Sequence, residues 1–292
     1  MRITRNNEGL GARVLGIDLA QPLAEDSFRT ILRALGEHGV LCFPDQSLEP
    51  FELSAFGSRF GELEINVANA FHAEGHPEVM VLSNIRRDGK PIGLNDAGQG
   101  WHTDMSYSHD VALANVLHAK QVPMRDGRPL GDTQFRNMHA AYDDLPREVK
   151  ERLEGRTAIH DFEKFWEVMR ARPGSGRKPL TEEQRRKKPP VSQPIFRVHP
   201  ITGRRVLYCN PGYAVRIEGM APEESDAMLD YLFKHQSQPQ YLYSHRWTPG
   251  DVLMWDNIGT THNAVSDYTT DEPRLIHRVQ VMATLDYARL AA

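Results

Sequence analysis

Apolar and polar positions recur along this chain with two different periods, which predicts both helices and strands. Residues 26–38 carry apolar side chains at helical spacing, namely Phe28, Ile31, Leu32 and Leu35. A second short helix is indicated by Leu53, Phe56 and Phe60, and a third begins at Pro222. Short apolar runs predict buried strands at 40–43, 79–82 and 111–122.

The rest of the chain is predicted to hold more strands than helices. A Pro/Gly turn at 199–203 separates strands at 194–198 and 205–209, and Thr248–Asp251 separates 241–247 from 252–255. We predict a hairpin in each case. The last strand covers 274–283, and a helical pattern at 136–153 is broken at Pro146. The fold class is therefore mainly β, with helices.

The stretch 170–190 differs in composition from its surroundings. It is rich in Arg, Lys, Pro and Gly and almost free of apolar residues, so it is not expected to supply core. We expect a flexible insertion there. A mobile lid with a positive rim for an anionic substrate and a solvated, poorly ordered loop both fit this composition.

The overall composition fits one soluble domain spanning residues 1–292. The chain is 40% hydrophobic and 25% charged, which suffices for a large core. Its net charge of −4 argues against nucleic acid or a membrane as a partner. No apolar run approaches the roughly 20 residues that span a bilayer, and residues 1–9 lack the apolar core of a signal peptide.

The two cysteines indicate the redox state of the cellular compartment. Cys42 and Cys209 both have apolar or aromatic neighbours, and one disulfide between them is formally possible. Two buried thiols in a reducing cytoplasm are the simpler interpretation. We therefore expect a cytoplasmic protein, and we expect it to form a homo-oligomer, either a dimer or a tetramer.

Two histidines and one aspartate are the candidate metal ligands. His102 and Asp104 stand two residues apart, so in an extended segment their side chains point to one face; His262 lies far downstream. Two imidazoles and one carboxylate leave three coordination positions of Fe(II) free for a co-substrate and O₂. A His-x-Asp triplet arises about once by chance in a chain of this composition, so a surface pair also fits the triplet alone.

Two arginines share one face of the last predicted strand. Arg274 and Arg278 lie four residues apart, about 13 Å along a strand. A guanidinium binds a carboxylate through two hydrogen bonds and stays charged when desolvated. The pair can therefore serve two different anions, although exposed arginines in surface ion pairs would show the same pattern.

Together these segments resemble the family of taurine dioxygenase and dichlorophenoxyacetate dioxygenase. The resemblance extends from about Gly11 to Ala283, with the motifs in the family's order. The motifs are Trp101-His102-Thr103-Asp104, Gly131-Asp132-Thr133, Pro249-Gly250-Asp251, Trp255-Asp256-Asn257, His262 and the Arg274/Arg278 pair. The resemblance implies a double-stranded β-helix (jelly-roll) core flanked by α-helices.

The resemblance also implies roles for these residues. His102, Asp104 and His262 would hold Fe(II), and Arg274 and Thr133 would bind the remote carboxylate of 2-oxoglutarate. Arg278 would face either the prime substrate's anionic group or the metal-side carboxylate of 2-oxoglutarate. The implied enzyme couples decarboxylation of 2-oxoglutarate by O₂ to hydroxylation of a small anionic substrate. That substrate falls apart if the hydroxylated carbon bears oxygen, sulfur or nitrogen.

Two positions depart from the taurine dioxygenases. After Phe60-Gly61-Glu62-Leu63 this chain offers Asn66 in place of a sulfonate-binding histidine, and Gly98 replaces an asparagine before the metal motif. We therefore expect the substrate to be a carboxylate, such as an aryloxyalkanoate, bound by Arg278 and Asn66. An alkylsulfonate dioxygenase and an oxygenase that tailors natural products stay open.

Two other classes of protein use similar residues. Zinc also accepts two histidines and a carboxylate, but a zinc hydrolase would need a catalytic glutamate, and none is apparent near the ligands. A non-enzymatic jelly-roll module that binds a small acid or sugar would need the His/Asp/His set to be structural. A halogenase is disfavoured because Asp104 takes the coordination position that a halide would need.

Overall fold

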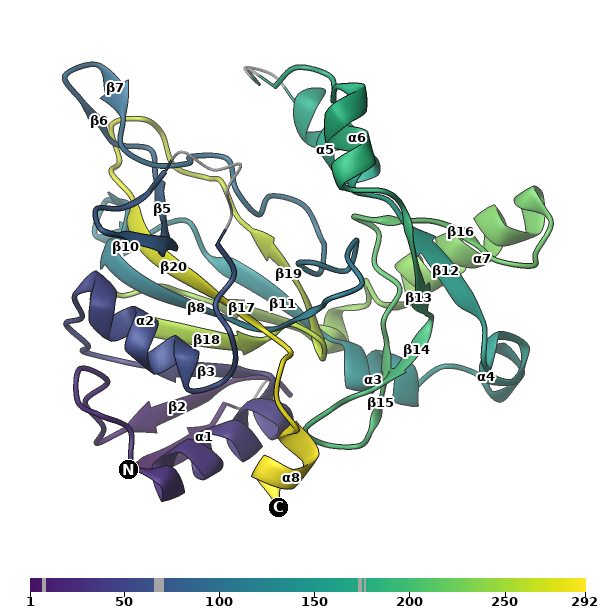
Figure 1. Ribbon diagram of the computed structural model, residues 1–292, viewed down its shortest axis with the longest axis horizontal. Coiled ribbons are helices and arrows are strands. Elements are labelled where there is room, and N and C mark those ends of the chain that lie inside the picture. The colour runs from purple at the N-terminus through teal and green to yellow at the C-terminus, as the bar shows by residue number, and fades with distance from the viewer. Residues whose placement is uncertain (7–8, 66–70, 173–174, 176) are drawn as a thin grey trace.

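The structure is a computed structural model that describes residues 1–6, 9–65, 71–172, 175 and 177–292. A large sheet and a small sheet face each other, and a lobe of short strands and helices lies beside them (Figure 1). No helix in the described ranges is long and apolar enough to cross a membrane.

The large sheet has eight strands in the order β1-β2-β3-β18-β8-β20-β5-β4. All neighbouring pairs are antiparallel except β2 and β3, which are parallel. The strands are β1 (Arg2–Arg5), β2 (Ala12–Leu15), β3 (Val40–Phe43), β18 (Val252–Asp256), β8 (Ala112–Gln121), β20 (Leu275–Met282), β5 (His76–Ser83) and β4 (His72–Ala73). The predicted strands at 40–43, 79–82, 111–122 and 274–283 are confirmed.

Two N-terminal helices cover the outer face of this sheet (Figure 1). They are α1 (Glu25–His38) and α2 (Pro50–Ser58), and both were predicted. Helix α1 buries Phe28, Ile31, Leu32 and Leu35 against outward-facing strand residues such as Met254 and Val279. It ends at Gly39, whose φ of 68° favours glycine and whose N–H bonds to the carbonyl of Leu35.

The small sheet has the order β17-β11-β19 and packs against the inner face of the large one. Its strands are β17 (Leu242–His245), β11 (Thr133–Asn137) and β19 (Thr260–Ala264). Phe135 and Tyr243 from the small sheet share an apolar cluster with Leu117, Trp255 and Ile276 from the large sheet. Because strand side chains alternate, β18 and β20 contribute to both this inner cluster and the outer core.

The hairpin predicted from 241–247 and 252–255 is wrong. Strand β17 pairs with β11 in the small sheet, whereas β18 pairs with β3 and β8 in the large sheet. The turn at Thr248–Asp251 therefore carries the chain from one sheet to the other. Trp247, only 1% exposed, fills the space between the sheets beside this corner, and its burial favours the crossing over a flat hairpin.

The lobe beside the two sheets is built from short strands. A three-stranded sheet, β13-β12-β16, comprises Val191–Pro194, Thr157–His160 and Ala214–Ile217. The predicted hairpin around the 199–203 turn is confirmed as β14 (Phe196–Val198) with β15 (Arg205–Leu207). Two pairs of two-residue strands complete the named strands: β6 (Arg86–Arg87) with β7 (Lys90–Pro91), and β9 (Met124–Arg125) with β10 (Arg128–Pro129).

Helices surround that lobe (Figure 1). The pattern broken at Pro146 is confirmed as two helices, and the helix expected at Pro222 is present. The helical segments are α3 (Met138–Asp143), α4 (Arg147–Leu153), α5 (Phe162–Arg170), α6 (Glu182–Lys187), α7 (Pro222–His235), the 3₁₀ turn η1 (Pro239–Tyr241) and, near the C-terminus, α8 (Tyr287–Ala291). Both cysteines are buried free thiols, as expected.

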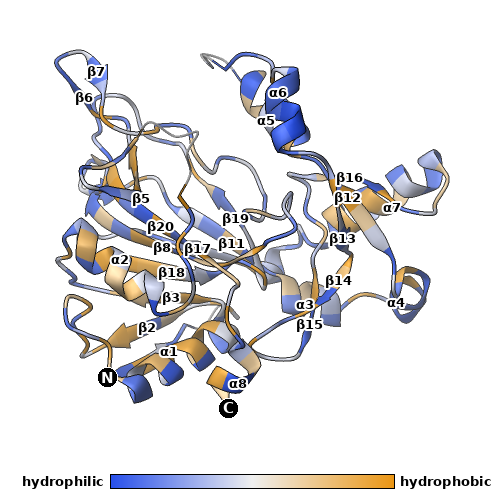
Figure 2. Ribbon diagram, in the orientation of Figure 1, coloured by the Kyte–Doolittle hydropathy of each residue, from blue (hydrophilic) through white to orange (hydrophobic). Residues whose placement is uncertain are grey.

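The stretch 170–190 contains more structure than its composition predicted. Thr181 and Gln184 form a reciprocal capping box that begins α6, which Figure 2 shows to be hydrophilic throughout. Leu180, just before it, is 5% exposed and so contributes an apolar contact. Local capping therefore supplies a short helix in this stretch where apolar periodicity is absent, and its flexibility stays a prediction.

Candidate active site

Two of the predicted metal ligands are fixed by one backbone bridge. His262 is the third residue of β19, and His102 lies opposite it in the loop before β8. The N–H of His102 donates to the carbonyl of His262 (3.1 Å), and the reverse bond measures 2.9 Å. The two rings therefore lie side by side, with centroids 4.2 Å apart.

Asp104 completes the set from a turn rather than a strand end. Met105 has a left-handed φ of 57°, so the chain turns away directly after Asp104. The side chain of Asn257 holds this turn, because its Nδ2 donates to the carbonyl of Asp104 (2.8 Å) and its Oδ1 accepts from the N–H of Asp104 (3.2 Å). These two hydrogen bonds hold Asp104 beside His102 at the point where the turn begins.

The three donor groups have the spacing of ligands around one ion. Nε2 of His102 lies 3.4 Å from Oδ1 of Asp104, and Nε2 of His262 lies 3.6 Å from Oδ2. Donor atoms about 2.1 Å from a shared metal lie roughly 3.0–3.5 Å apart. The carbonyl of Gly100 is 2.7 Å from Nδ1 of His102, which places the proton on Nδ1 and leaves Nε2 free to coordinate.

The protonation states suit a metal site. Burial, reinforced by the neighbouring His102, lowers the pKa of His262 well below its ordinary value, so its ring is neutral. Burial by itself would raise the pKa of Asp104, but the guanidinium of Arg278, the strongest opposing charge, holds that pKa well below its usual range. A neutral imidazole and an ionised carboxylate are the forms that bind a cation.

Arg278 has an internal partner that its neighbours in the sequence did not indicate. Its Nη2 lies 2.8 Å from Oδ2 of Asp104, and its Nε donates to Oδ1 of Asn115 (3.0 Å). It also bonds to Gln280 on the same strand. Much of the charge of Arg278 is therefore balanced by Asp104, a candidate metal ligand, and Arg278 lines the same cavity.

Arg274, unlike Arg278, is not paired with a carboxylate among the described residues. Its side chain is 8% exposed and forms no ion pair with any residue in the described ranges. Burial lowers its pKa, and the contact with Tyr268 opposes this shift only in part. A buried guanidinium without a carboxylate is costly, so this position calls for an anionic ligand.

One cavity brings six predicted residues together. It holds about 400 Å³ of space, including its open mouth, and its polar wall consists of His102, Asp104, His262, Thr133, Arg274 and Arg278. Leu82, Leu117 and Trp255 form an apolar wall. The hydroxyl of Thr133 accepts a hydrogen bond from Trp247 (3.0 Å) and keeps its own proton available to donate. Gly98 borders the cavity, whereas Asn66 lies outside the described residues.

Comparison with known proteins identifies the family. The profile described as "Taurine catabolism dioxygenase TauD, TfdA family" matches residues 3–280. The chain belongs to the TauD/TfdA family. It is 35% identical over 261 residues to the alpha-ketoglutarate-dependent 2,4-dichlorophenoxyacetate dioxygenase of Cupriavidus pinatubonensis, covering 86% of this chain and 87% of that one. It is 33% identical to pentalenolactone F synthase of Streptomyces arenae, covering 92% and 91%.

A solved structure extends the match to the whole fold. The crystal structure of AAD-2 in complex with Mn(II) and N-oxalylglycine superposes with a TM-score of 0.82 at 28% identity, covering 97% of this chain and 99% of that one. N-oxalylglycine carries the same two carboxylates as 2-oxoglutarate. The predicted jelly-roll core, the 2-oxoglutarate-dependent dioxygenase class and the requirement for a metal, 2-oxoglutarate and O₂ are confirmed.

Two further groups of side chains could in principle hold a metal in this TauD/TfdA protein, but neither borders the cavity. In the group His139, His199 and Asp256, the backbone N–H groups at 201 and 202 donate to Nδ1 of His199. The proton of the neutral ring is therefore on Nε2, which faces Asp256 at 2.9 Å and offers no lone pair to a metal.

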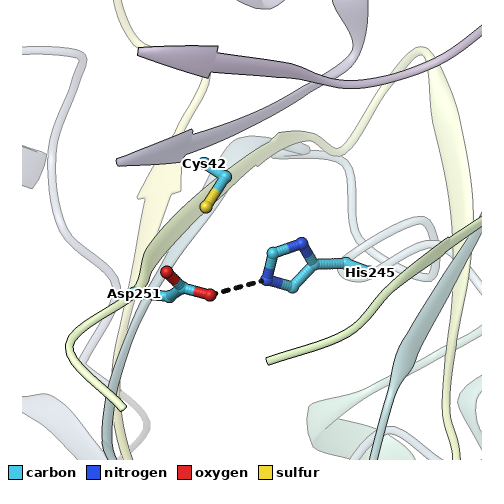
Figure 3. A group of neighbouring side chains, drawn as sticks. All are labelled: Cys42, His245 and Asp251. Atoms are coloured by element: carbon cyan, nitrogen blue, oxygen red, sulfur yellow. Dashed lines mark ion pairs between the residues drawn. The ribbon is translucent and has the colours of Figure 1, made fainter. Parts of the chain in front are cut away.

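The group Cys42, His245 and Asp251 is drawn in Figure 3. Nε2 of His245 faces Oδ2 of Asp251 at 3.3 Å, and that oxygen also accepts the N–H of Thr248 (2.9 Å). Burial and the charge of Asp251 raise the pKa of the Cys42 thiol, so the thiol stays protonated and is a poor ligand. This group stabilises the corner between β17 and β18.

Sequence reasoning missed a group of rings beside the metal ligands. Tyr107, Phe162, Phe165 and Tyr213, which we call the aromatic wall, contact one another with centroids 4.8–5.1 Å apart. Phe165 also reaches the ring of His102, 4.8 Å away. Phe162 and Phe165 show helical spacing in the sequence, but nothing local indicated that α5 packs against the metal loop.

Proposed function

We propose that this protein is an Fe(II)- and 2-oxoglutarate-dependent dioxygenase in which His102, Asp104 and His262 hold the metal. Arg274 and Thr133 bind the remote carboxylate of 2-oxoglutarate. One observation carries the proposal: a convergent His/Asp/His set shares one cavity with a buried arginine that forms no ion pair among the described residues. A zinc hydrolase would leave Arg274 without a role, and a non-enzymatic binding module would leave the His/Asp/His set without one.

The metal and 2-oxoglutarate, when bound, would supply the oxidising chemistry with O₂ as the oxidant, and the products would be succinate, CO₂ and a hydroxylated substrate. The chain's own residues orient the metal ligands and exclude water from the site. The Gly100 carbonyl fixes the tautomer of His102, and Arg278 keeps Asp104 ionised. Leu82, Leu117 and Trp255 exclude water from the cavity. No general base is required, so none is assigned.

We propose that the substrate is a small organic acid, most simply a carboxylate of the aryloxyalkanoate type. Arg278 faces its acidic group, and Asn66, which lies outside the described residues, is a further proposed substrate-binding residue. Two observations support this class: the aromatic wall beside His102, and relatives named for 2,4-dichlorophenoxyacetate and (S)-phenoxypropionate. Other relatives are named for a sulfate ester and for pentalenolactone F, so sulfonates and natural products are the alternative substrates.

We also propose that residues 1–292 act as one domain, and that the stretch 170–190 covers the site. Arg172 bonds to Gln99, and Arg177 forms a two-bond pair with Asp96 (2.8 and 3.0 Å), so this stretch is tied to the loop before His102. A cytoplasmic location is supported by the two free thiols. A dimer or tetramer is the proposed assembly.

The experiment is an anaerobic titration followed by turnover. Fe(II) and 2-oxoglutarate together should give a visible absorbance band that neither gives alone. Succinate release in air should then rise on adding phenoxyacetate, an alkanesulfonate or a sulfate ester, and the largest rise identifies the class. No band and no succinate with any of these compounds would contradict the proposed function.

A further inference from the structure

Lys188 is the one residue of 181–190 that is partly buried; the others are exposed. It follows three further cations at the end of α6, of which Arg186 and Lys187 are exposed and Arg185 contacts Glu163. Its backbone N–H bonds back to the carbonyls of Gln184 and Arg185 (3.2 Å each), which closes the helix. Lys188 is therefore the one cation of this basic run that the end of the helix directs toward the protein.

The ammonium group of Lys188 lies on the aromatic wall. It is 4.8 Å from the ring centroid of Tyr107 and 4.7 Å from that of Phe162. Such contacts stabilise a cation over a ring face without neutralising it. In the described part of the chain Lys188 forms no ion pair, and burial lowers its pKa while the charge of Glu64 opposes that shift.

The helix that carries Lys188 is held in place from both sides. The capping box of Thr181 and Gln184 fixes its start, and Arg185 bonds to both carboxylate oxygens of Glu163 on α5 (2.7–3.0 Å). Helix α5 in turn supplies Phe162 and Phe165 to the aromatic wall. Lys188 is therefore positioned relative to His102 through two helices.

The charged groups around the metal ligands and Lys188 are unbalanced. Asp104 pairs with Arg278, and the proposed Fe(II) and 2-oxoglutarate carry equal and opposite charge. Glu64 is half-buried, its charge acts on Lys188 and Arg278, and burial raises its pKa. With Arg274 included, three cations stand against two carboxylates, and the one net positive charge attracts an anion.

We propose that Lys188 binds the acidic group of a substrate whose flat apolar body lies along the aromatic wall formed by Tyr107, Phe162, Phe165 and Tyr213. This rests on the proposed function, because it places the substrate next to the metal ligand His102. Arg278, whose charge is already shared with Asp104, then supplies N–H donors, while Lys188 supplies the net charge. The substrate class is an aromatic or similarly flat carboxylic acid.

The test compares Lys188→Met with Lys187→Met in the full chain loaded with Fe(II) and 2-oxoglutarate. Methionine keeps the length and apolar contact of the side chain and removes its charge. Lys187 is the matched control because it is the adjacent lysine, is exposed and pairs with Glu183 at 2.8 Å. The probes are phenoxyacetate and its neutral amide, phenoxyacetamide, with affinity read from the change in the 2-oxoglutarate–iron absorbance and KM from succinate release.

We expect Lys188→Met to weaken phenoxyacetate binding about tenfold or more, with little change for phenoxyacetamide. Lys187→Met should match the wild type for both probes, and Lys188→Arg should restore most of the affinity. The absorbance without substrate should be unchanged in all variants, which separates this test from that of the proposed function. Equal phenoxyacetate affinity in wild type and Lys188→Met, or no phenoxyacetate binding by an absorbance-competent wild type, would overturn the inference.

Discussion

A single carboxylate, that of Asp104, is shared between the metal position and Arg278. Its Oδ2 lies 2.8 Å from Nη2 of Arg278 and 3.6 Å from Nε2 of His262. Changes at Arg278 are therefore expected to disturb the metal as well as any substrate. Arg274 forms no ion pair among the described residues, so it gives the cleaner test of ligand binding at the level of one side chain.

Arg274→Ala should raise the concentration of 2-oxoglutarate required for half-maximal turnover more than Thr133→Val does. The first change removes the only cation assigned to the remote carboxylate, a loss of about 2–5 kcal/mol. The second removes one hydroxyl, worth about 0.5–1.5 kcal/mol in binding. Thr133→Val should also lower thermal stability, because Trp247 loses its buried acceptor. A larger KM effect from Thr133→Val would mean that the anchoring residues are assigned in the wrong order.

His160 is expected to make the fold sensitive to acid. It is fully buried, both ring nitrogens lack a hydrogen-bond partner among the described residues, and burial lowers its pKa to about 3. Below pH 6.5 the unfolded chain takes up a proton at this site that the folded chain does not. The free energy of unfolding should therefore fall by about 1.4 kcal/mol per pH unit from this residue as the pH drops toward 3.

His160→Phe removes that proton uptake and keeps the stacking with Tyr208. Urea unfolding at pH 7.0, 6.0 and 5.0 should show a shallower loss of stability in the variant than in the wild type. Parallel curves for the two proteins would show that His160 is not buried in a neutral form.

Loop 98–107 carries two of the proposed metal ligands but has no regular secondary structure. Hydrogen bonds from side chains of other elements must therefore hold it in place. Asn257 binds both backbone groups of Asp104 and is fully buried. Asn257→Ala should weaken Fe(II) or Mn(II) binding at least tenfold, because Asp104 is no longer held in its turn, and should also cost about 1–3 kcal/mol of stability. Metal titration and thermal unfolding measure the two effects separately.

Asn137→Ala is the matched control for that variant. Its side chain caps α3 by accepting the N–H of Ala140, away from the metal ligands. It should lose about 1 kcal/mol of stability with unchanged metal affinity. If both asparagine variants bound metal equally well, Asn257 would be a purely structural residue.

The stretch 170–190 is tied to the metal loop by one well-placed ion pair. Arg177→Ala removes the two hydrogen bonds to Asp96 and the cation–π contact with Trp166. If this stretch excludes water from the site, the variant should consume more 2-oxoglutarate per hydroxylated product. Arg170→Ala removes an exposed pair with Glu167 in the same region and should leave this ratio unchanged. An unchanged ratio in both variants would indicate a solvated loop.

Ligand binding should be visible in the stability of the whole molecule. Mn(II) with 2-oxoglutarate at about 100 times their apparent Kd should add roughly 2.7 kcal/mol to the free energy of unfolding and raise the Tm by about 5 °C or more. His102→Ala, Asp104→Ala and His262→Ala should each fold, lose turnover and lose this shift. His139→Ala, which removes a buried histidine outside the cavity, should keep the shift even if its starting Tm is lower. A normal shift in any of the three ligand variants would contradict the metal assignment.

Much of the molecule could be predicted from local patterns. The apolar periodicity located α1, α2, α7 and the strands β3, β5, β8 and β20, because a face that must be buried repeats with the period of its own element. The sequence also singled out His102, Asp104, His262, Thr133 and Arg274, because metal and carboxylate binding need particular side chains, and the structure places all five around one cavity. The alternation in the last strand correctly put Arg274 and Arg278 on one wall.

Contacts between distant segments could not be predicted in this way. Local periodicity shows that a strand buries a face but not which strand it pairs with, so the chain's crossing between sheets at Thr248–Asp251 was mistaken for a hairpin. The turn at Asp104 depends on Asn257, 153 residues away, and the partner of Arg278 lies 174 residues away. The sequence by itself determined which chemical groups this protein brings to its site, because those are properties of single residues. Only the tertiary structure decided how they are aimed and which charges remain unpaired, because packing sets the distances between segments that are far apart in the chain.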